Sequence, residues 1–268
     1  MGKSNNRPLI LVTNDDGYKA KGVSKLTEIA KEFGDVVVMA ASESQSAKSH
    51  SITIKDPIMY KKMEDTPELT RYILKGTPAD GVKMALNSVL NRKPDLLLSG
   101  INHGTNSSTS VVYSGTMAAA LEGAIHKIPS IGFSILDYRP DADFDAAEPF
   151  VKQIIQQTIS NGLEEGICLN VNIPAVPREE IRGIMICRQT NGYWKESFEI
   201  REDPRGAEYS WLTGHFINRE PEATDTDEWA LQNNYLSVVP VQSDFTAHEQ
   251  ISKLKAWEKS DTYNESSR

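Results

Sequence analysis

The sequence predicts an α/β protein with a Rossmann-like, doubly wound and mostly parallel sheet, followed by a β-rich C-terminal excursion and a terminal helix. Three observations support this prediction. Short continuous apolar runs, typical of strands buried on both faces of a sheet, recur along the first 190 residues. Segments with apolar residues at helical spacing alternate with these runs. The alternation stops near residue 188, and a chain of 268 residues can bury such a core without disulfides.

The first predicted unit is a strand, a helix and a second strand. Residues 9–12 form a continuous apolar run that ends in the polar turn 13–17. Apolar residues then recur at helical spacing between 26 and 33, and a glycine ends this helix. Residues 36–39 form the second buried strand. A β-α-β unit of this kind predicts that its two strands are parallel.

Further strands and a helix are predicted up to residue 99. A polar, serine-rich loop covers residues 42–51, and residues 51–54 and 71–74 are expected to form shorter alternating strands. Pro78 begins the next predicted helix, because proline suits a first helical turn. Residues 95–99 form a third buried parallel strand.

The alternation continues through the middle of the chain. A helix of small residues is predicted over 117–125, and hydroxyl and glycine residues at 114–116 begin it. A strand follows at 130–135, an amphipathic helix at 151–159 and a strand at 169–173.

We therefore expect three regions along the chain. Residues 1–190 form the Rossmann-like core that holds the metal site, and residues 191–234 form an irregular or β-hairpin excursion rich in aromatic and charged residues. Residues 235–268 contain a returning strand at 235–241, a C-terminal helix and a frayed tail from about residue 259.

Composition excludes several classes of partner. The chain has 37 acidic and 29 basic residues, a formal net charge of -8, and so lacks the basic excess that long nucleic acids or anionic membranes require. The N-terminus has no apolar signal segment, and the longest apolar run, at 36–41, is too short to cross a bilayer. Cys168 and Cys187 lie in apolar stretches and are expected to be buried thiols. These features predict a cytoplasmic protein. The acidic net charge is still compatible with a small anionic substrate that is held through a metal ion.

Three predicted strand ends carry oxygen-rich loops. In an open parallel sheet, ligands bind beyond the carboxyl ends of the strands. The loops are residues 14–17, with Asp15 and Asp16, the serine loop, with Ser46, and residues 99–104. If the strands are neighbours, two carboxylates, a hydroxyl and an amide converge, a set that suits Mg2+ or Mn2+. The alternative is that Asp-Asp-Gly is a solvated turn.

The helix that begins near Ser114 offers a phosphate cradle. Ser114, Gly115 and Thr116 permit close backbone approach, and a helix N-terminus aims free N–H groups at an anion. The alternative is an ordinary serine N-cap. The sequence has neither Gly-x-Gly-x-x-Gly after the first strand nor a P-loop, which counts against a dinucleotide-binding oxidoreductase and a P-loop nucleotidase.

Four blocks of the sequence, taken in order, resemble the signature blocks of the survival protein SurE family. They are Val-Thr-Asn-Asp-Asp-Gly at 12–17, Gly-Thr-Pro-Ala-Asp at 76–80, Pro-Asp-Leu-Leu-Leu-Ser-Gly-Ile-Asn-His-Gly at 94–104 and Val-Tyr-Ser-Gly-Thr-Met-Ala-Ala-Ala-Leu-Glu-Gly at 112–123. The resemblance covers about residues 8–250. It implies a metal-dependent 5'/3'-nucleotidase that dephosphorylates nucleoside monophosphates.

The resemblance also implies a site. The family's metal ligands are two aspartates, a serine and an asparagine, which correspond here to Asp15, Asp16, Ser46 and Asn102. The sequence departs from the family's pattern after the second strand, where Ala-Ala-Ser replaces Ala-Pro-Asp at 40–42 and Ala47 replaces the glycine after the ligand serine. It departs again at 104–108, where Gly-Thr-Asn-Ser-Ser replaces Gly-x-Asn-Leu-Gly.

The expected function is hydrolysis of phosphomonoesters at one divalent metal ion, Mg2+ or Mn2+, per subunit. Asp15 and Asp16 are the expected catalytic residues, and the phosphate is expected to bind at Asn102, Ser114, Gly115 and Thr116. The alternatives are a broad phosphatase or exopolyphosphatase acting on polyphosphate, and a non-catalytic metal-dependent nucleotide-binding module. The resemblance implies a homodimer or homotetramer whose C-terminal segments are exchanged, with residues 191–234 and the terminal helix as the exchanging parts.

Overall fold

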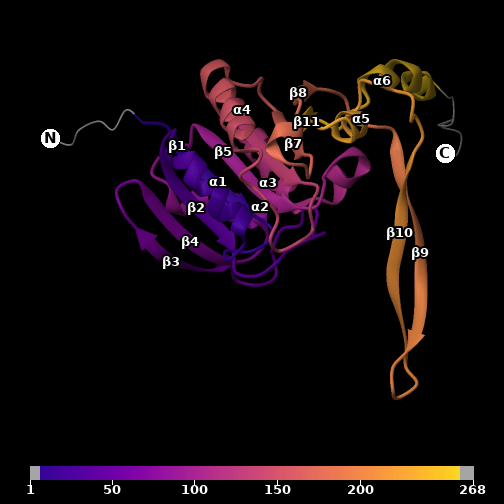
Figure 1. Ribbon diagram of the computed structural model, residues 1–268, viewed down its shortest axis with the longest axis horizontal. Coiled ribbons are helices and arrows are strands. Elements are labelled where there is room, and N and C mark those ends of the chain that lie inside the picture. The colour runs from indigo at the N-terminus through magenta and orange to yellow at the C-terminus, as the bar shows by residue number, and fades with distance from the viewer. Residues whose placement is uncertain (1–6, 260–268) are drawn as a thin grey trace, which may run out of the picture.

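A nine-stranded sheet forms the centre of the structure, a computed structural model that describes residues 7–259 (Figure 1). Its strand order is β3-β4-β2-β1-β5-β6-β7-β11-β8. The strands are β1 (Leu9–Asn14), β2 (Asp35–Ala41), β3 (Met59–Asp65), β4 (Leu69–Lys75), β5 (Leu96–His103), β6 (Ser130–Ile135), β7 (Ile167–Ile173), β8 (Gly183–Ile186) and β11 (Tyr235–Gln242).

Six strands, from β4 to β7 in the sheet order, run parallel, and antiparallel pairs lie toward the edges. β1 pairs in parallel with both β2 and β5, which confirms the predicted first β-α-β unit. β3 is antiparallel to β4, and β11 is antiparallel to β7. The sheet is therefore mixed but mostly parallel, as the sequence predicts.

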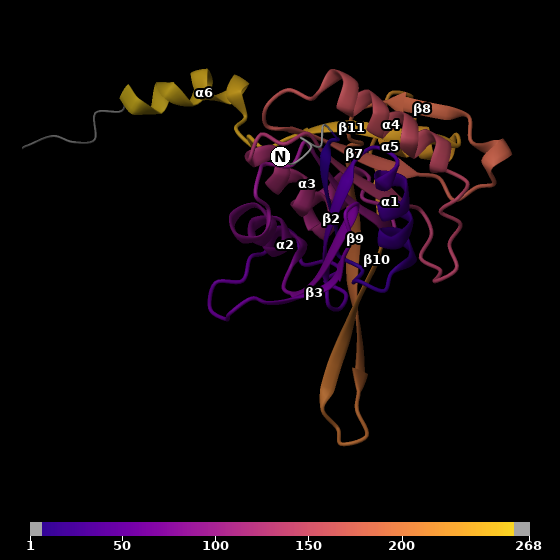
Figure 2. The same cartoon turned by 90° about the vertical axis from the view of Figure 1, so that its left-hand side faces the viewer.

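Helices cover both faces of the sheet, so the fold is doubly wound as predicted (Figures 1 and 2). The helices of this layer arrangement are α1 (Lys21–Lys31), α2 (Pro78–Met84), α3 (Gly115–Ile125) and α4 (Glu148–Asn161). Successive side chains of β1 point to opposite faces. Ile10 and Val12 belong to the cluster that contains α1 and α4, whereas Leu11 packs with α2 and α3. Complete burial of one such leucine contributes about 2 kcal/mol.

The prediction of a strand at residues 51–54 is wrong. These residues have no regular structure, and the backbone N–H and hydroxyl of Thr53 donate hydrogen bonds to Asp80 at 2.9 and 2.6 Å. The segment is therefore fastened to the start of α2, and Ile54 remains 80% exposed. The edge strand is instead β3, whose side chains are largely exposed, which apolar patterning does not detect.

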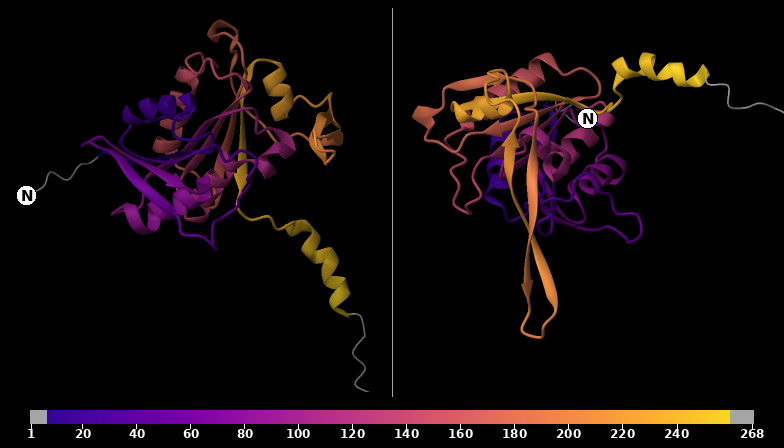
Figure 3. Two further views of the ribbon diagram at one scale, coloured as in Figure 1. Left: turned by 90° about the horizontal axis from the view of Figure 1, so that it is seen from below. Right: turned by 90° about the vertical axis from the view of Figure 1, so that its right-hand side faces the viewer.

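The C-terminal third contains two projecting elements. β9 (Gly192–Glu202) and β10 (Glu208–Asn218) form a long antiparallel hairpin that extends away from the sheet (Figures 1 and 3). α5 (Asp227–Gln232) packs near β11, and α6 (His248–Leu254) leads outward from the body (Figures 2 and 3). The hairpin and a C-terminal helix were both predicted, while the predicted tail beyond residue 259 lies outside the described residues.

Two smaller expectations from the sequence can also be compared with the structure. Cys168 and Cys187 are free and buried, as predicted. Among residues 7–259, no helix is both long enough and apolar enough to cross a membrane.

Candidate active site

The carboxyl ends of β1, β2 and β5 meet at one edge of the sheet, because β1 lies between the other two. The turn after β1 contacts the serine loop (residues 42–51), since the backbone N–H of Gln45 donates to the carbonyl of Asp15 at 2.7 Å. The same turn contacts the end of β5, where the backbone N–H of His103 donates to Asp16 Oδ2 at 3.0 Å. We refer to this meeting point of the three loops as the crevice.

Asp15 is held at the first turn of α3. Its side chain is 3% exposed, and its Oδ1 accepts a hydrogen bond of 2.6 Å from the hydroxyl of Thr116. Gly115 makes this approach possible, because a Cβ there would lie only 3.0 Å from the Cβ and Oδ2 of Asp15. Burial raises the pKa of Asp15 to about 6, against the lowering effect of the Thr116 hydrogen bond.

Asp16 lies next to Asp15 and is also largely buried. Burial raises its pKa, while the backbone N–H and the charge of His103 act in the opposite direction. Within residues 7–259, neither aspartate forms an ion pair with a lysine, arginine or histidine. Two adjacent carboxylates, one buried and one partly buried, that lack an ion-pair partner are a donor set that fits a divalent ion.

Asn102 and Ser46 supply neutral oxygens near these acids. The Nδ2 of Asn102 donates to the carbonyl of Gly104 at 2.8 Å, which leaves Oδ1 as the amide atom able to coordinate a cation. Asn102 follows a shift in the pairing register between β5 and β6, which Gly100 accommodates at φ 124°. Ser46 is exposed, and its hydroxyl contacts the hydroxyl of Ser44 at 2.8 Å.

The donor chemistry limits which ion the crevice suits. In the part of the chain that the structure describes, no group of three or more histidine, cysteine, aspartate or glutamate side chains could hold a metal. Any ion in the crevice would be held by two carboxylates together with neutral oxygens and water. Such a set fits Mg2+ or Mn2+ better than Zn2+.

The start of α3 is capped by its own serine, which is the alternative that the sequence left open. Ser114 is the N-cap, and its hydroxyl accepts a hydrogen bond of 3.0 Å from the backbone N–H of Met117. Thr116 is fully buried and bonds to Asp15, a contact between residues 101 positions apart that spacing along the chain did not reveal. The expectation that Ser114, Gly115 and Thr116 bind phosphate remains a prediction.

A buried ionic cluster lies farther along α3. Glu122 is 3% exposed and pairs with His50 at 2.9 Å, with Lys83 at 2.5 Å and with His126 at 3.2 Å. Burial would raise its pKa, but the hydrogen bonds from His50 and Lys83 and the charge of Lys83 outweigh burial and lower the pKa to about 2. Because His50 belongs to the serine loop, this cluster connects that loop to α2 and α3. His50, Lys83 and Glu122 are far apart in the sequence, so no local pattern indicates the cluster.

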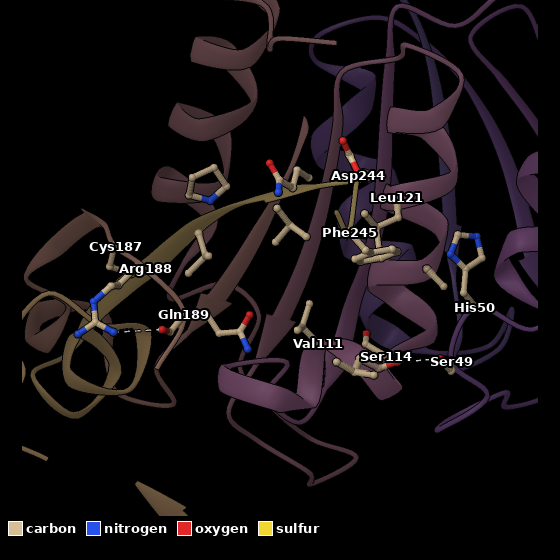
Figure 4. Close-up of a pocket in the computed structure, with 16 residues that line it drawn as sticks. Ser49, His50, Val111, Ser114, Leu121, Cys187, Arg188, Gln189, Asp244 and Phe245 are labelled. Atoms are coloured by element: carbon tan, nitrogen blue, oxygen red, sulfur yellow. Dashed lines mark hydrogen bonds between the residues drawn. The ribbon is translucent and has the colours of Figure 1, made fainter. Parts of the chain in front are cut away.

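A hollow of about 750 Å³, here called the C-terminal hollow, lies beside the crevice (Figure 4). Ser49, Ser114 and Phe245 lie toward one side of it, and Arg188 lies at the other. Its wall includes neither Asp15 nor Asp16, so the chemistry of the crevice lies outside it.

Comparisons with known proteins agree with the fold and the motifs. The sequence model of the family described as "Survival protein SurE" matches residues 10–196. The 5'-nucleotidase SurE of Christiangramia forsetii is 51% identical over 257 residues, which cover 95% of this chain and 98% of that protein. The 5'-nucleotidase SurE of Flavobacterium psychrophilum is 49% identical over 253 residues, covering 94% of this chain and 98% of that protein. The crystal structure of SurE protein from Aquifex aeolicus superposes with a TM-score of 0.81 at 36% identity, covering 94% of this chain and 100% of that one.

Proposed function

The chain belongs to the SurE family, and on that basis we propose that it is a metal-dependent phosphohydrolase that removes phosphate from nucleoside 5'- and 3'-monophosphates. The observation that carries the proposal is the pair of adjacent carboxylates beside the N-terminus of α3, of which Asp15 is buried and Asp16 is partly buried. The names of the relatives, 5'-nucleotidase SurE, support the nucleotide as substrate.

Asp15, Asp16, Ser46 and Asn102 are the residues that would hold one Mg2+ or Mn2+ ion. When bound, such an ion supplies positive charge for the phosphoryl oxygens and increases the acidity of a coordinated water. One of the two aspartates would orient the attacking water or accept the single proton that it releases. Thr116 keeps the carboxylate of Asp15 in position for these roles.

The N-terminus of α3 is the proposed phosphate site. The first N–H groups of a helix have no partner within the helix and favour an anion. The hydroxyl of Ser114 accepts the bond from Met117, so its own proton is free to be donated to a phosphate oxygen. Gly115 allows the Asp15 carboxylate to lie against this helix end, and Asn102 lies at the same edge of the sheet. These groups stabilise the charge that develops during transfer.

The net charge of -8 limits the length of the substrate rather than its charge. One terminal phosphate needs only the local positive potential of the ion and the helix end. A long polyphosphate or nucleic acid needs many cationic contacts. We therefore propose mononucleotides as the main substrates and expect polyphosphate to be hydrolysed more slowly.

The proposal is tested by phosphate release from 5'- and 3'-mononucleotides, polyphosphate and sugar phosphates, with Mn2+ or Mg2+ and with a chelator. We expect hydrolysis of mononucleotides that depends on the metal, and an Asp15→Asn variant should lose at least 100-fold in kcat while remaining folded. Circular dichroism checks the fold of the variant. Binding of nucleotide without any turnover would contradict the enzyme proposal and favour a non-catalytic nucleotide-binding module.

A further inference from the structure

A second hollow, of about 590 Å³, lies between the serine loop, the 3-10 turn η2 (Ser108–Tyr113) and the base of the β9–β10 hairpin. We call it the hairpin hollow. Its wall includes Ala47, which follows Ser46 in the chain, and Tyr113, which precedes Ser114. Because neighbouring Cα atoms are only about 3.8 Å apart, the hollow opens one residue away from two groups of the proposed active site.

Two aromatic side chains face the hairpin hollow. Trp194 is fixed by a hydrogen bond of 3.2 Å from its Nε1 to the hydroxyl of Ser110. The edge-to-face contact with Phe216, at 6.3 Å between ring centroids, holds it from the other side. Trp194 nevertheless remains 39% exposed, and Tyr113 is 56% exposed. A flat heteroaromatic ligand can therefore stack on the Trp194 ring, which is already positioned, beside the exposed ring of Tyr113.

An accessible carboxylate lies on the same face of β9 as Trp194. Glu196 is two residues farther along the strand, and residues two apart in a strand share a face. Its partner in the opposite strand is Gly214, where a Cβ would lie 2.6 Å from the carbonyl oxygen of Lys195. No side chain therefore occupies the space across from Glu196. Within residues 7–259, the carboxylate of Glu196 has neither an ion pair nor a hydrogen bond.

The C-terminal hollow differs from the hairpin hollow in that its charged side chains already have partners. Its carboxylate, Asp244, already accepts hydrogen bonds of 2.8 Å from the backbone N–H of Thr246 and from His248. Its guanidinium, Arg188, is paired with Glu220 and Asp225. The two charged groups Asp244 and Arg188 of the C-terminal hollow are thus already paired, whereas Glu196 in the hairpin hollow is available to a ligand.

We propose that the hairpin hollow binds the base of the nucleotide substrate and that Glu196 favours guanine. The inference rests on the proposed function and specifies which nucleobase of the nucleoside monophosphate is preferred. Trp194 and Tyr113 stack on the base. A carboxylate only accepts hydrogen bonds, and guanine presents two adjacent donors, N1–H and the 2-amino group, to it. Adenine presents one donor beside the acceptor N1, which a carboxylate repels, so GMP is expected to have a kcat/KM about tenfold above that of AMP.

The stacking role is tested with GMP and with ribose 5-phosphate, which has the sugar phosphate but no base. Trp194→Ala should raise KM for GMP about tenfold and leave ribose 5-phosphate unchanged, and Trp194→Phe should restore the wild-type value. Tyr193 is a matched control, because it is equally exposed at 39% and lies on the opposite face of β9. Tyr193→Ala should change neither substrate.

The base preference is tested with Glu196→Gln. A glutamine amide both donates and accepts, so it pairs with N1 and the 6-amino group of adenine. The ratio of kcat/KM for GMP over AMP should therefore fall about tenfold, with ribose 5-phosphate unchanged.

Other results would overturn the inference. They are an equal loss on GMP and ribose 5-phosphate in Trp194→Ala, an unchanged base preference in Glu196→Gln, and a KM for GMP that responds to Phe245→Ala in the C-terminal hollow. If the wild-type protein hydrolysed no phosphomonoester, the proposed function would fail. The base site would still be tested by calorimetric binding of GMP, which must weaken about tenfold in Trp194→Ala.

Discussion

The buried hydroxyl of Thr116 positions one carboxylate of the proposed active site and affects its pKa. It is fully buried at the first turn of α3 and donates a hydrogen bond of 2.6 Å to Asp15. Burial raises the pKa of Asp15, and the hydrogen bond from Thr116 lowers it. Without that bond, the pKa of Asp15 would rise above about 6. The Thr116 hydroxyl therefore helps to keep Asp15 ionised at neutral pH.

We predict that Thr116→Val lowers kcat about tenfold at pH 7 and shifts the acidic limb of the pH–rate profile toward higher pH. The sign follows from the loss of a bond that favours the charged carboxylate, so Asp15 stays protonated to a higher pH. Thr116→Ser keeps a hydroxyl and should retain most of the activity and the wild-type profile. A Thr116→Val variant with a lower kcat but an unchanged profile would contradict this assignment.

For individual residues, the sequence predicted the types of donor side chain in the site better than the hydrogen bonds that orient them. The residue types Asp15, Asp16 and Asn102 and their positions at or just beyond the ends of apolar strands were sufficient to predict an oxygen-rich edge of the sheet. The contacts that orient them were not predictable, because the Thr116 hydroxyl and the His103 backbone N–H approach from distant parts of the chain. Hydrogen-bond partners that are far apart in sequence leave no periodic signal.

At the scale of elements, Glu122 joins three segments of the chain. Its carboxylate on α3 accepts hydrogen bonds from Lys83 at the end of α2 and pairs with His50 of the serine loop. The cluster therefore couples the position of the serine loop, which contains Ser46, to the helices behind it. A buried carboxylate without these partners would cost several kcal/mol.

The cluster predicts a defined pH dependence of stability. The pKa of Glu122 is lowered to about 2 in the folded protein, so its stabilising effect is present above the unfolded pKa of about 4.5 and is lost as pH falls from there toward 2. The wild-type protein should lose on the order of 3 kcal/mol in this window through Glu122.

Urea denaturation at pH 7 and at pH 3 measures this contribution. Glu122→Gln should be less stable at pH 7 and should lose less stability on acidification than the wild type. Glu165→Gln is the control, because Glu165 pairs with Lys127 on the surface, where both side chains are more than half exposed. Equal acid sensitivity in the Glu122→Gln variant and the wild type would show that the cluster does not set the pH dependence.

Elements with apolar periodicity were predictable, and the errors occurred where polar contacts decide the structure. The apolar runs of β1 and β2 and the small residues of α3 were sufficient to predict their type. The alternating residues 51–54 resemble a strand, but Asp80 binds the backbone and hydroxyl of Thr53 and fixes the segment as a loop. The local sequence alone does not show whether such a segment pairs as a strand or is held as a loop by a distant side-chain acceptor.

At the scale of the whole molecule, apolar side chains gather on the projecting elements. The hairpin exposes Phe198, Ile200, Trp211 and Leu212 by 59–69%, and α6 with the turn after it exposes Ile251, Leu254 and Trp257. These elements extend away from the body (Figure 3), and these apolar side chains are largely exposed. Exposed apolar side chains gathered on projecting elements are typical of an interface between proteins. It supports the expectation of a homodimer or homotetramer.

The last prediction concerns this assembly. Ile200 lies far along the hairpin and is 69% exposed, so in an assembly through the hairpin a charge at this position would be buried in each copy. Ile200→Glu should weaken self-association about tenfold or more, which analytical ultracentrifugation over a range of concentrations measures. Ile54→Glu is a matched control, because Ile54 is 80% exposed in a loop on the body and should leave association unchanged. If the Ile200→Glu variant kept the wild-type association constant, or if Ile54→Glu weakened association equally, the hairpin would not be the assembling element.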